Sequence, residues 1–282
     1  MELKELKQKM DEAHYIYDET MATVLYVALQ LGRPLLIEGA AGVGKTEVAK
    51  VAAKVMDREL VRMQCYEGLD ESKSLYEWNY QKQLLSIQVG NHGMSDLFGE
   101  DYLLERPLLK SIRSEEPVVL LIDEIDKADA EFEAFLLELL SEMQVTIPEY
   151  GTVRAKSTPF IVLTSNHTRP LSEALRRRCA YLYIEYPDVE KEIRILRAKL
   201  PGLDEVLAKQ VARAAAYLRA SDKVLKKPSV AESIDWASAL MALGAKELDD
   251  ETCAQTIGFA LKNNEDIKEI MADDEFIRCL IQ

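Results

Sequence analysis

The sequence predicts an α/β fold: a three-layer αβα domain around a parallel sheet, followed by a smaller all-α domain. Short apolar runs without alternation occur up to Pro187, and segments with apolar residues at helical spacing lie between them. Such runs are typical of strands that are buried on both faces, as in a parallel sheet flanked by helices. After Pro187 only helical patterns remain, which indicates a separate helical unit.

The expected elements follow in chain order. Apolar residues at helical spacing between Leu3 and Leu31 predict a helical segment, which Gly32 and Pro34 stop. Strands are expected at residues 34–38, 60–65, 117–122, 160–164 and 181–186, with helices at 46–56, 102–113 and 129–143. Later helices are expected at 189–199, 204–220, 230–243, 251–262 and 267–281. We therefore predict a helical segment at 1–32, an αβα domain at 33–187 and an all-α domain at 188–282.

Length and charge restrict the class of protein. A chain of 282 residues is long for one domain and sufficient for two. It carries 35 Lys and Arg against 49 Asp and Glu, a formal charge of −14, so nucleic acid and anionic membranes are disfavoured partners. No apolar run is long enough to span a bilayer, and the charged first 20 residues do not read as an export signal. Cys65, Cys179, Cys253 and Cys279 lack metal-binding spacing and are expected to be buried thiols in a reduced, cytoplasmic setting.

A glycine-rich loop follows the first expected strand. Residues 39–46 read GAAGVGKT, a full match to G-x-x-x-x-G-K-[ST] between a strand and a helix. In this pattern backbone N–H groups surround phosphates, Lys45 neutralises the β- and γ-phosphates, and the Thr46 hydroxyl lies on Mg²⁺. A plain glycine-rich turn is the alternative, which the flanking elements disfavour. The residues expected to bind ATP are Gly39, Ala40, Ala41, Gly42, Val43, Gly44, Lys45, Thr46 and Glu47.

Two acids end the third expected strand, where ligands of open α/β sheets bind. The run VVLLI leads directly into Asp123 and Glu124. Asp123 is expected to hold Mg²⁺ through its water shell, and Glu124 to polarise the water that attacks the γ-phosphate. The alternative is a solvated loop start, which the glycine-rich loop upstream disfavours.

Two weaker signals follow. Asn166 comes after the strand at 160–164, where its amide can orient water without adding charge, although such an Asn is more often a turn residue. Arg176, Arg177 and Arg178 end a short helix. They either cap the helix dipole or include a finger that reaches the γ-phosphate of a neighbouring subunit, and the residues alone do not rank these alternatives.

In this order, GAAGVGKT, VVLLIDEID, IVLTSN and ALRRRC resemble the Walker A, Walker B, sensor 1 and arginine-finger elements of P-loop AAA+ ATPases. The stretch MQVTIPEYGTVRA resembles the hairpin that follows Walker B in the MoxR family, and YEWNYQKQLL, ERPLLKSI and KPSVAESIDWA look closest to its CoxD-like branch. The resemblance implies that Lys45 and Thr46 bind nucleotide and Mg²⁺, and that Asp123 and Glu124 coordinate and activate. It further implies that Asn166 senses the γ-phosphate. Arg178 matches the finger position best, with Arg177 as the second candidate.

One segment departs from the family pattern. Many relatives carry a sensor 2 arginine at the start of a helix of the all-α lid domain, whereas this chain reads KPSVAE, with Ala231 at the corresponding place. Alanine cannot contact phosphate. Either Lys226 or Lys227 substitutes, or both are solvated lysines before a Pro-Ser helix cap.

Several features carry no assignment. The aromatic residues Tyr76, Trp78 and Tyr80, followed by an irregular stretch at 90–99, form either a partner-contacting or pore-facing insertion or core packing. The VTIPEYGTV hairpin, with its turn between Pro148 and Gly151, is either a substrate-touching loop or a closed local structure. The three histidines, His14, His92 and His167, form no triad or ligand set and receive no role.

The resemblance implies an ATPase with ATP and Mg²⁺ as cofactors, which acts as a homo-oligomer, expected to be a hexameric ring. It would remodel a client protein or help to mature a metalloenzyme. The CoxD-like likeness implies a client such as a molybdenum hydroxylase of the carbon monoxide dehydrogenase type, with a von Willebrand A-domain partner. The alternative is a nucleotide-switched nucleic-acid machine, such as a restriction or clamp-loading ATPase, against which the net charge speaks.

Overall fold

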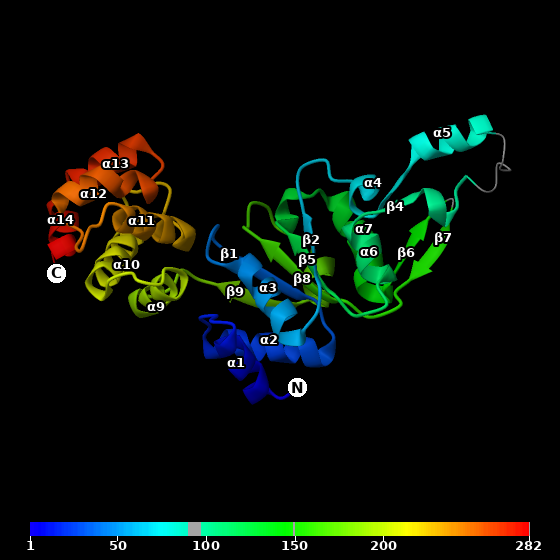
Figure 1. Cartoon of the computed structure of the whole chain (residues 1–282), viewed down its shortest axis with the longest axis horizontal. Helices are drawn as coiled ribbons and strands as arrows, with labels where there is room; N and C mark the ends of the chain where they lie inside the picture. The colour runs from blue at the N-terminus through cyan, green and yellow to red at the C-terminus, as the bar shows by residue number, and fades with distance from the viewer. Residues whose placement is uncertain (90–96, 149, 282) are drawn as a thin grey trace. The chain divides into compact units, whose positions relative to one another are not determined.

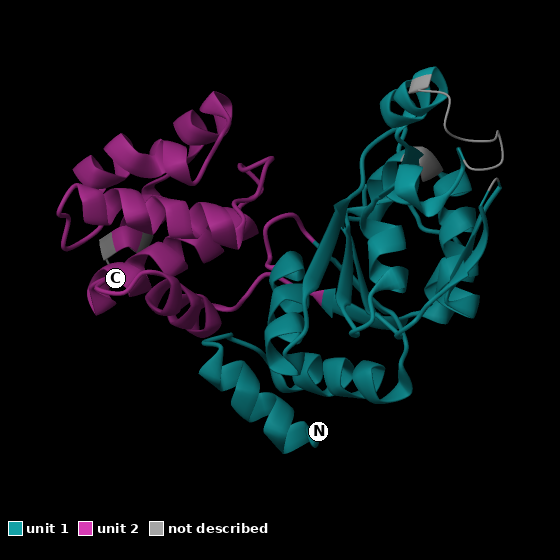
Figure 2. Cartoon of the chain, turned by 45° about the vertical axis from the view of Figure 1, so that its right-hand side comes forward, with its two compact units in different colours: residues 1–39, 45–183 teal, residues 40–44, 184–282 magenta. Residues whose placement is uncertain are grey.

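The computed structural model describes residues 1–89, 97–148 and 150–281 (Figure 1). The chain separates into two compact units, residues 1–39 with 45–183 and residues 40–44 with 184–282 (Figure 2). Within the described ranges, no helix is both long enough and apolar enough to cross a membrane.

A five-stranded sheet forms the centre of the first unit, in the order β2-β5-β8-β1-β9. The strands are β1 (Leu35–Gly39), β2 (Leu60–Gln64), β5 (Val119–Asp123), β8 (Phe160–Ser165) and β9 (Ala180–Ile184). The pairs β2–β5, β5–β8 and β8–β1 are parallel. Every residue of β1, β5 and β8 is buried, because both faces of the inner strands are covered. The predicted three-layer αβα sheet domain is confirmed.

The two faces of the sheet pack against different helices. Leu36, Leu120 and Leu163 join one apolar core with residues of α6 (Pro107–Arg113) and α7 (Ala130–Glu142). Their neighbours along each strand point to the opposite face, since side chains alternate in a strand. There α3 (Lys45–Met56) contacts the strands through a buried apolar side. The edge strand β2 alternates buried Val61 and Met63 with more exposed residues.

The N-terminal helical stretch is divided. Instead of one run, the chain forms α1 (Leu3–Glu12) and α2 (Glu19–Leu31). His14 adopts a left-handed conformation with φ 55°, and the Asp18 carboxylate accepts a hydrogen bond from the Met21 N–H and so begins α2. Gly32, with φ 60°, ends α2 as expected.

The helix predicted at 102–113 is wrong in its first half. Residues Glu100–Tyr102 form the 3-10 helix η2, and β4 (Leu103–Glu105) pairs antiparallel with β3 (Tyr76–Trp78). Helix α6 begins only at Pro107, because proline fits the first turn of a helix and holds the residue before it extended. The remaining pieces of this region are α4 (Glu71–Ser74) and α5 (Tyr80–Val89).

The hairpin after α7 consists of β6 (Gln144–Ile147) and β7 (Gly151–Arg154), paired antiparallel with Gln144 opposite Arg154. Its predicted turn includes residue 149, which lies outside the described residues. The irregular stretch predicted at 90–99 falls largely outside them as well, together with His92. Downstream, α8 (Glu173–Arg178) contains the three arginines.

The helical region of the second unit contains more breaks than the sequence predicts. Its longer helices are α9 (Val189–Lys199), α10 (Glu205–Ala220) and α11 (Val230–Ala242). The helix predicted at 251–262 is α12 (Asp250–Thr256) continued by the 3-10 helix η4 (Ile257–Phe259), and the one at 267–281 is divided into α13 (Asn264–Met271) and α14 (Asp274–Ile281). Asn263 and Asp273 accept hydrogen bonds from backbone N–H groups at the starts of these two helices, which explains the second division.

Candidate functional site

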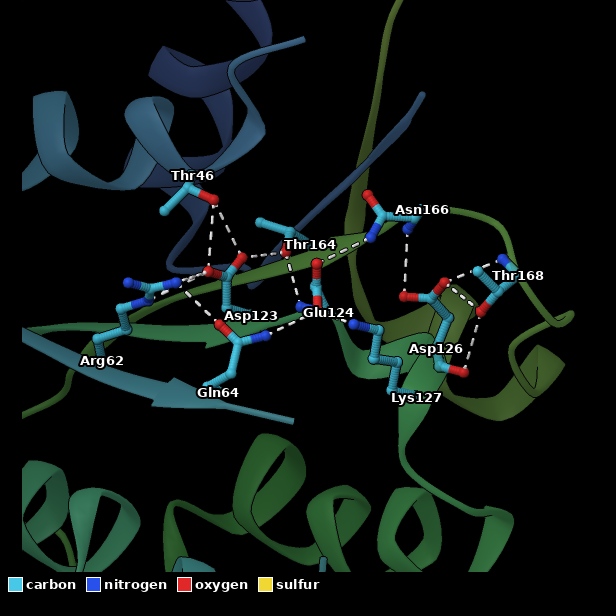
Figure 3. A network of polar contacts seen from close by, with 10 residues as sticks. All are labelled: Thr46, Arg62, Gln64, Asp123, Glu124, Asp126, Lys127, Thr164, Asn166 and Thr168. Atoms are coloured by element: carbon cyan, nitrogen blue, oxygen red, sulfur yellow. Dashed lines mark hydrogen bonds and ion pairs between the residues drawn. The ribbon is translucent and has the colours of Figure 1, made fainter. Parts of the chain in front are cut away.

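The carboxyl ends of β2, β5 and β8 lie side by side, and their polar side chains form one network (Figure 3). Asp123 is buried at the end of β5. Its Oδ1 accepts hydrogen bonds from the Thr164 hydroxyl at 2.6 Å and from the Thr46 hydroxyl at 3.1 Å. Its Oδ2 accepts from Nη2 of Arg62 on β2 at 2.6 Å and from Nε of the same residue at 3.1 Å. Both oxygens of the predicted metal ligand are therefore engaged.

Glu124 is held by three side chains from three elements (Figure 3). Its Oε1 accepts from the Asn166 amide at 3.1 Å, and its Oε2 accepts from the Gln64 amide at 2.9 Å. The Lys127 ammonium lies 2.5 Å from Oε2. The backbone of Glu124 is left-handed, with φ 57°, a strained conformation for a residue with a side chain. The donors hold the carboxylate in one place, as a general base requires.

Asp126 ties the loop after β8 to the loop after β5. It is 3% exposed, and its carboxylate accepts from the Asn166 N–H at 3.1 Å, from the Thr168 N–H at 2.9 Å and from the Thr168 hydroxyl at 2.6 Å. Burial raises the pKa of Asp126, but these hydrogen bonds outweigh burial and leave the pKa below its usual value. Asp126 is thus an ionised anchor for the segment that carries Asn166.

Lys45 begins α3 and is 6% exposed. Its ammonium donates to the carbonyl oxygen of Gly39 at 2.8 Å. Burial lowers the pKa of Lys45, and the carboxylates of the neighbouring acids partly oppose this. The loop between them requires glycine at two positions, because Gly42 and Gly44 have φ of 71° and 96°.

The donor set around Asp123 fits Mg²⁺. A carboxylate and a hydroxyl oxygen within 3.1 Å of each other are hard ligands of the kind that Mg²⁺ prefers, with phosphate oxygens and water completing its shell. Among the described residues there is no group of three or more His, Cys, Asp or Glu side chains that could hold a metal ion alone.

Comparison with known proteins identifies the family of this chain. The family model described as "AAA domain (dynein-related subfamily)" matches residues 34–179, just over half of the chain. The chain belongs to this family. The AAA chain is 25% identical over 221 residues to an uncharacterized protein of Staphylococcus saprophyticus, covering 76% of this chain and 79% of that protein. It is 26% identical over 212 residues to one of Staphylococcus epidermidis, covering 73% and 76%.

The fold of the AAA chain is also similar to a solved structure, a point mutant of RuvB from Thermotoga maritima. The TM-score is 0.51 with 16% sequence identity, over 94% of this chain and 72% of that chain. Family and fold together make this protein a P-loop ATPase of the AAA type, a class that binds nucleotide, typically with Mg²⁺.

The three arginines of α8 have separate partners in the AAA protein. Arg176 turns inward to the buried carboxylate of Glu38, with Nη2 3.3 Å from Oε2. Arg177 is 79% exposed and pairs with Glu173 one turn earlier. Arg178 donates from Nε to the Ser141 hydroxyl at 2.7 Å and from Nη1 to the Ala174 carbonyl at 3.0 Å. The last-turn arginines also suit the helix dipole, so the capping and finger alternatives both stay open.

The KPSVAE segment, residues 227–232, lies in the second unit. A capping box of Ser229 and Glu232 begins α11 there. The Lys227 ammonium donates to the Ser221 carbonyl of its own unit, and the Lys226 N–H donates to Asp266 at 3.3 Å. Lys227 thus has a partner within the helical unit and is half-buried rather than solvated, so the role of these lysines stays open.

The sequence did not single out several residues of the network. They share a position beside Asp123, Glu124 or Asn166: Arg62, Gln64, Lys127, Thr164 and Thr168. Arg62 and Gln64 are separated by one residue on β2, which places them on the same face of the strand. This alternation predicts that Arg62 and Gln64 share a face, but which acids they contact depends on β2 lying next to β5.

Cys65, Cys179 and Cys253 are buried free thiols as predicted, and burial raises the pKa of each to about 12, so they are unreactive.

Trp78 is buried in the core of the first unit, whereas Tyr80 is 62% exposed on α5. The aromatic stretch is therefore partly core and partly surface.

Proposed function

We propose that this AAA ATPase uses ATP hydrolysis to remodel or mature a client protein, as a homo-oligomeric ring expected to be a hexamer. The observation that carries the hydrolytic step is the placement of the two acids. Asp123 contacts the Thr46 hydroxyl, while Glu124, the next residue, is held separately by Asn166, Gln64 and Lys127. This separates a metal-binding carboxylate from a water-activating one.

In the proposed reaction each residue has one role. Thr46 and Asp123 would hold Mg²⁺, which when bound would neutralise charge on the phosphate oxygens, and Lys45 supplies a further positive charge. Glu124 accepts the proton of a water molecule as its oxygen bonds to the γ-phosphorus and the bond to the β–γ bridging oxygen breaks. Asn166 fixes Glu124 and orients that water.

A finger acting in trans completes the proposed site. Arg178 is the first candidate, and reaching a neighbouring subunit requires it to release Ser141 and the Ala174 carbonyl. Arg177 is the second candidate, since its exposed pair with Glu173 is worth little. Such a finger contributes about 10³ to 10⁵ in rate.

The proposed client is a protein rather than a nucleic acid. The formal charge of −14 opposes a polyanion, and α5 exposes the apolar residues Tyr80, Leu84, Leu85 and Ile87. Placement in the MoxR family, near its CoxD-like branch, rests on the sequence resemblance, which includes the hairpin of β6 and β7. A metalloenzyme client of the carbon monoxide dehydrogenase type and a von Willebrand A-domain partner rest on that resemblance alone. The division into a helical segment at 1–32, a nucleotide-binding domain at 33–187 and a lid at 188–282 is part of the same proposal.

Two variants test the hydrolytic core. Lys45→Ala removes the phosphate-neutralising charge and is expected to abolish ATP binding in calorimetry. Glu124→Gln is expected to bind ATP and Mg²⁺ normally but to lose about 10² to 10⁴ in turnover, because the general base is gone. Glu131→Gln, an exposed acid in the first turn of α7, is the matched control. Turnover retained in Glu124→Gln would remove Glu124 from the mechanism.

The client class is tested with the same protein. ATPase activity is measured at physiological salt with added duplex DNA, and with the proteins that the Glu124→Gln variant retains in the presence of ATP. Stimulation by a retained protein and no response to DNA supports the proposal. Stimulation by DNA supports the nucleic-acid alternative instead.

A further inference from the structure

A second buried carboxylate lies beside the candidate site. Glu38 is the penultimate residue of β1, directly before Gly39, and it is 1% exposed. It lies opposite Ser165 in the parallel register of β1 and β8, and Asn166 is the next residue of that strand's chain. Glu38 thus stands between the start of the phosphate-binding loop and the segment that carries Asn166. The proposed reaction gives Glu38 no role.

Three polar side chains converge on Glu38. Arg176 approaches with Nη1 3.4 Å from Oε1 and Nη2 3.3 Å from Oε2, and the Tyr181 hydroxyl donates to Oε2 at 2.9 Å. His167 Nδ1 lies 3.4 Å from Oε2. The Arg176 guanidinium also lies over the Tyr181 ring, 5.4 Å from its centroid. A buried carboxylate without such partners would be strongly destabilising, so Arg176 is held to this position.

The helix that carries Arg176 depends on such anchors. Helix α8 has six residues, too few to be stable by itself in water. At its start the Ser172 hydroxyl accepts from the Leu175 N–H, and Leu175 is buried. At its carboxyl end, Arg176 is the side chain that reaches a buried carboxylate. The last turn is also held by the contacts of Arg178 with Ser141 and Ala174 and by the start of β9 at Ala180, so the pair of Arg176 and Glu38 is one of the contacts that direct it.

We propose that Glu38 and Arg176 are positioning residues for the arginine finger. The buried carboxylate fixes Arg176, which fixes the last turn of α8 and so presents Arg178 to the nucleotide of a neighbouring subunit. This role rests on the proposed function, because it requires a finger that acts in trans. In this proposal Arg176 itself contacts neither substrate nor metal, and its loss is expected to leave nucleotide binding by its own subunit largely unchanged.

The proposal predicts a defect that a neighbour can correct. Arg176→Gln is expected to lower kcat about 100-fold, since a displaced catalytic group costs about that much, while the Kd for ATP changes less than about twofold. Mixing Arg176→Gln with Glu124→Gln subunits is expected to raise turnover at least about tenfold, because the added subunits carry intact fingers. A merely structural defect in the Arg176→Gln subunit would not be corrected in this way.

Two further proteins make the test complete. Arg178→Ala mixed with Glu124→Gln reports the trans finger itself, and Arg58→Gln, just before the amino end of β2, is the control for loss of an arginine. If Arg178→Ala is rescued but Arg176→Gln is not, the positioning role is overturned and the trans finger stands. If Arg178→Ala is not rescued either, the trans finger is overturned and the positioning role falls with it.

The substitution leaves Glu38 buried without its cation, which risks unfolding. The double variant Glu38→Gln/Arg176→Gln removes both charges and keeps the helix without Arg176. It is expected to show the same low kcat and the same rescue. A double variant with wild-type kcat would overturn the proposal.

Discussion

Buried carboxylates paired with arginine occur in both units, and the pair at Asp123 differs in exposure from the pair at Glu192. In the first unit Asp123 is 4% exposed, while its partner Arg62 is 52% exposed. In the second unit Glu192 of α9 is 0% exposed and Arg219 of α10 is 7% exposed. One guanidinium faces solvent, whereas the other is enclosed.

The remaining hydrogen bonds of the two arginines explain what each pair does. Arg219 donates to both oxygens of Glu192, to the Pro228 carbonyl at 2.8 Å and to the Ser233 hydroxyl at 3.1 Å. It thereby joins α9, α10 and the start of α11, and it also lies 4.8 Å from the centroid of the Tyr186 ring. Among the described residues, Arg62 has one partner besides Asp123, the exposed Gln64. The enclosed pair of Arg219 and Glu192 connects three helices and is structural. In the half-exposed pair of Arg62 and Asp123, a metal ion can take the place of the guanidinium.

The largest expected effect is therefore in the helical unit. Arg219→Gln leaves Glu192 buried and unpaired, so we expect a loss of about 3 to 5 kcal/mol in the free energy of unfolding. Urea unfolding is followed by Trp236 fluorescence in a Trp78→Phe background, because Trp236 lies in the core of the helical unit. The matched control is Arg213→Gln, an exposed arginine of the same helix α10.

A neutral pair sharpens this comparison. Arg219→Met combined with Glu192→Leu removes both buried charges and is expected to recover most of the lost stability. If Arg219→Gln lowered the free energy of unfolding no more than Arg213→Gln does, the enclosed pair would not stabilise the helical unit.

An intermediate effect is expected for Asp126, a buried carboxylate held by hydrogen bonds rather than by arginine. The Asp126 carboxylate accepts from the N–H groups of Asn166 and Thr168 through both oxygens. In Asp126→Asn one of these oxygens becomes an NH₂ donor, so we expect the free energy of unfolding to fall by about 2 kcal/mol. Trp78 fluorescence in a Trp236→Phe background follows the first unit, with Glu131→Gln as the control.

The sign of its pH dependence follows from the lowered pKa of Asp126. A carboxyl group with a folded pKa below its unfolded value of about 3.9 stabilises the protein fully above that value, and this contribution is lost as the pH falls through the folded pKa. The difference between wild type and Asp126→Asn is expected to be the same at pH 7 and pH 5 and to shrink near pH 3. A difference that grows toward acid pH would contradict this role for Asp126.

Features set by local sequence could be predicted, whereas features set by contacts between distant segments could not. The inner strands were recognisable because burial on both faces leaves an apolar run, and the acids were placed correctly because Asp123 ends such a run. The break between α13 and α14 was missed, since a short capping side chain at Asp273 interrupts an apolar period that looks continuous. The false helix start at 102–106 has a similar cause, because pairing with β3 overrides helical spacing.

The contacts around the acids were beyond the sequence for another reason. Arg62 and Gln64 reach Asp123 and Glu124 only because β2 lies beside β5, although 54 residues separate the end of one from the start of the other. Strand order is a property of the assembled sheet. The catalytic roles of Lys45 and Glu124 stay predictions, which the variants above test, and the role of Asn166 also stays a prediction.

The smallest expected effect concerns the exchangeable pair. If Mg²⁺ binds beside Thr46 and Asp123 as proposed, the positive charge of Arg62, whose Nη2 lies 2.6 Å from Oδ2 of Asp123, would oppose its binding. Arg62→Gln is expected to tighten metal binding to the ADP complex about five- to tenfold. The change is modest because a half-exposed arginine is partly screened by water. Binding is measured with Mn²⁺ by electron paramagnetic resonance, which does not depend on turnover, and Arg58→Gln is the control.

The free energy of unfolding gives the opposing test of the same idea. Because Arg62 is half exposed and the Thr46 and Thr164 hydroxyls still donate to Asp123 without it, its loss is expected to cost the first unit less than about 1 kcal/mol, in contrast to the loss at Arg219. Unchanged or weaker Mn²⁺ binding in Arg62→Gln would show that Arg62 supports the metal ligand instead of competing for it. The two arginines would then differ only in exposure, and Arg62 would be one of the residues that stabilise the metal site.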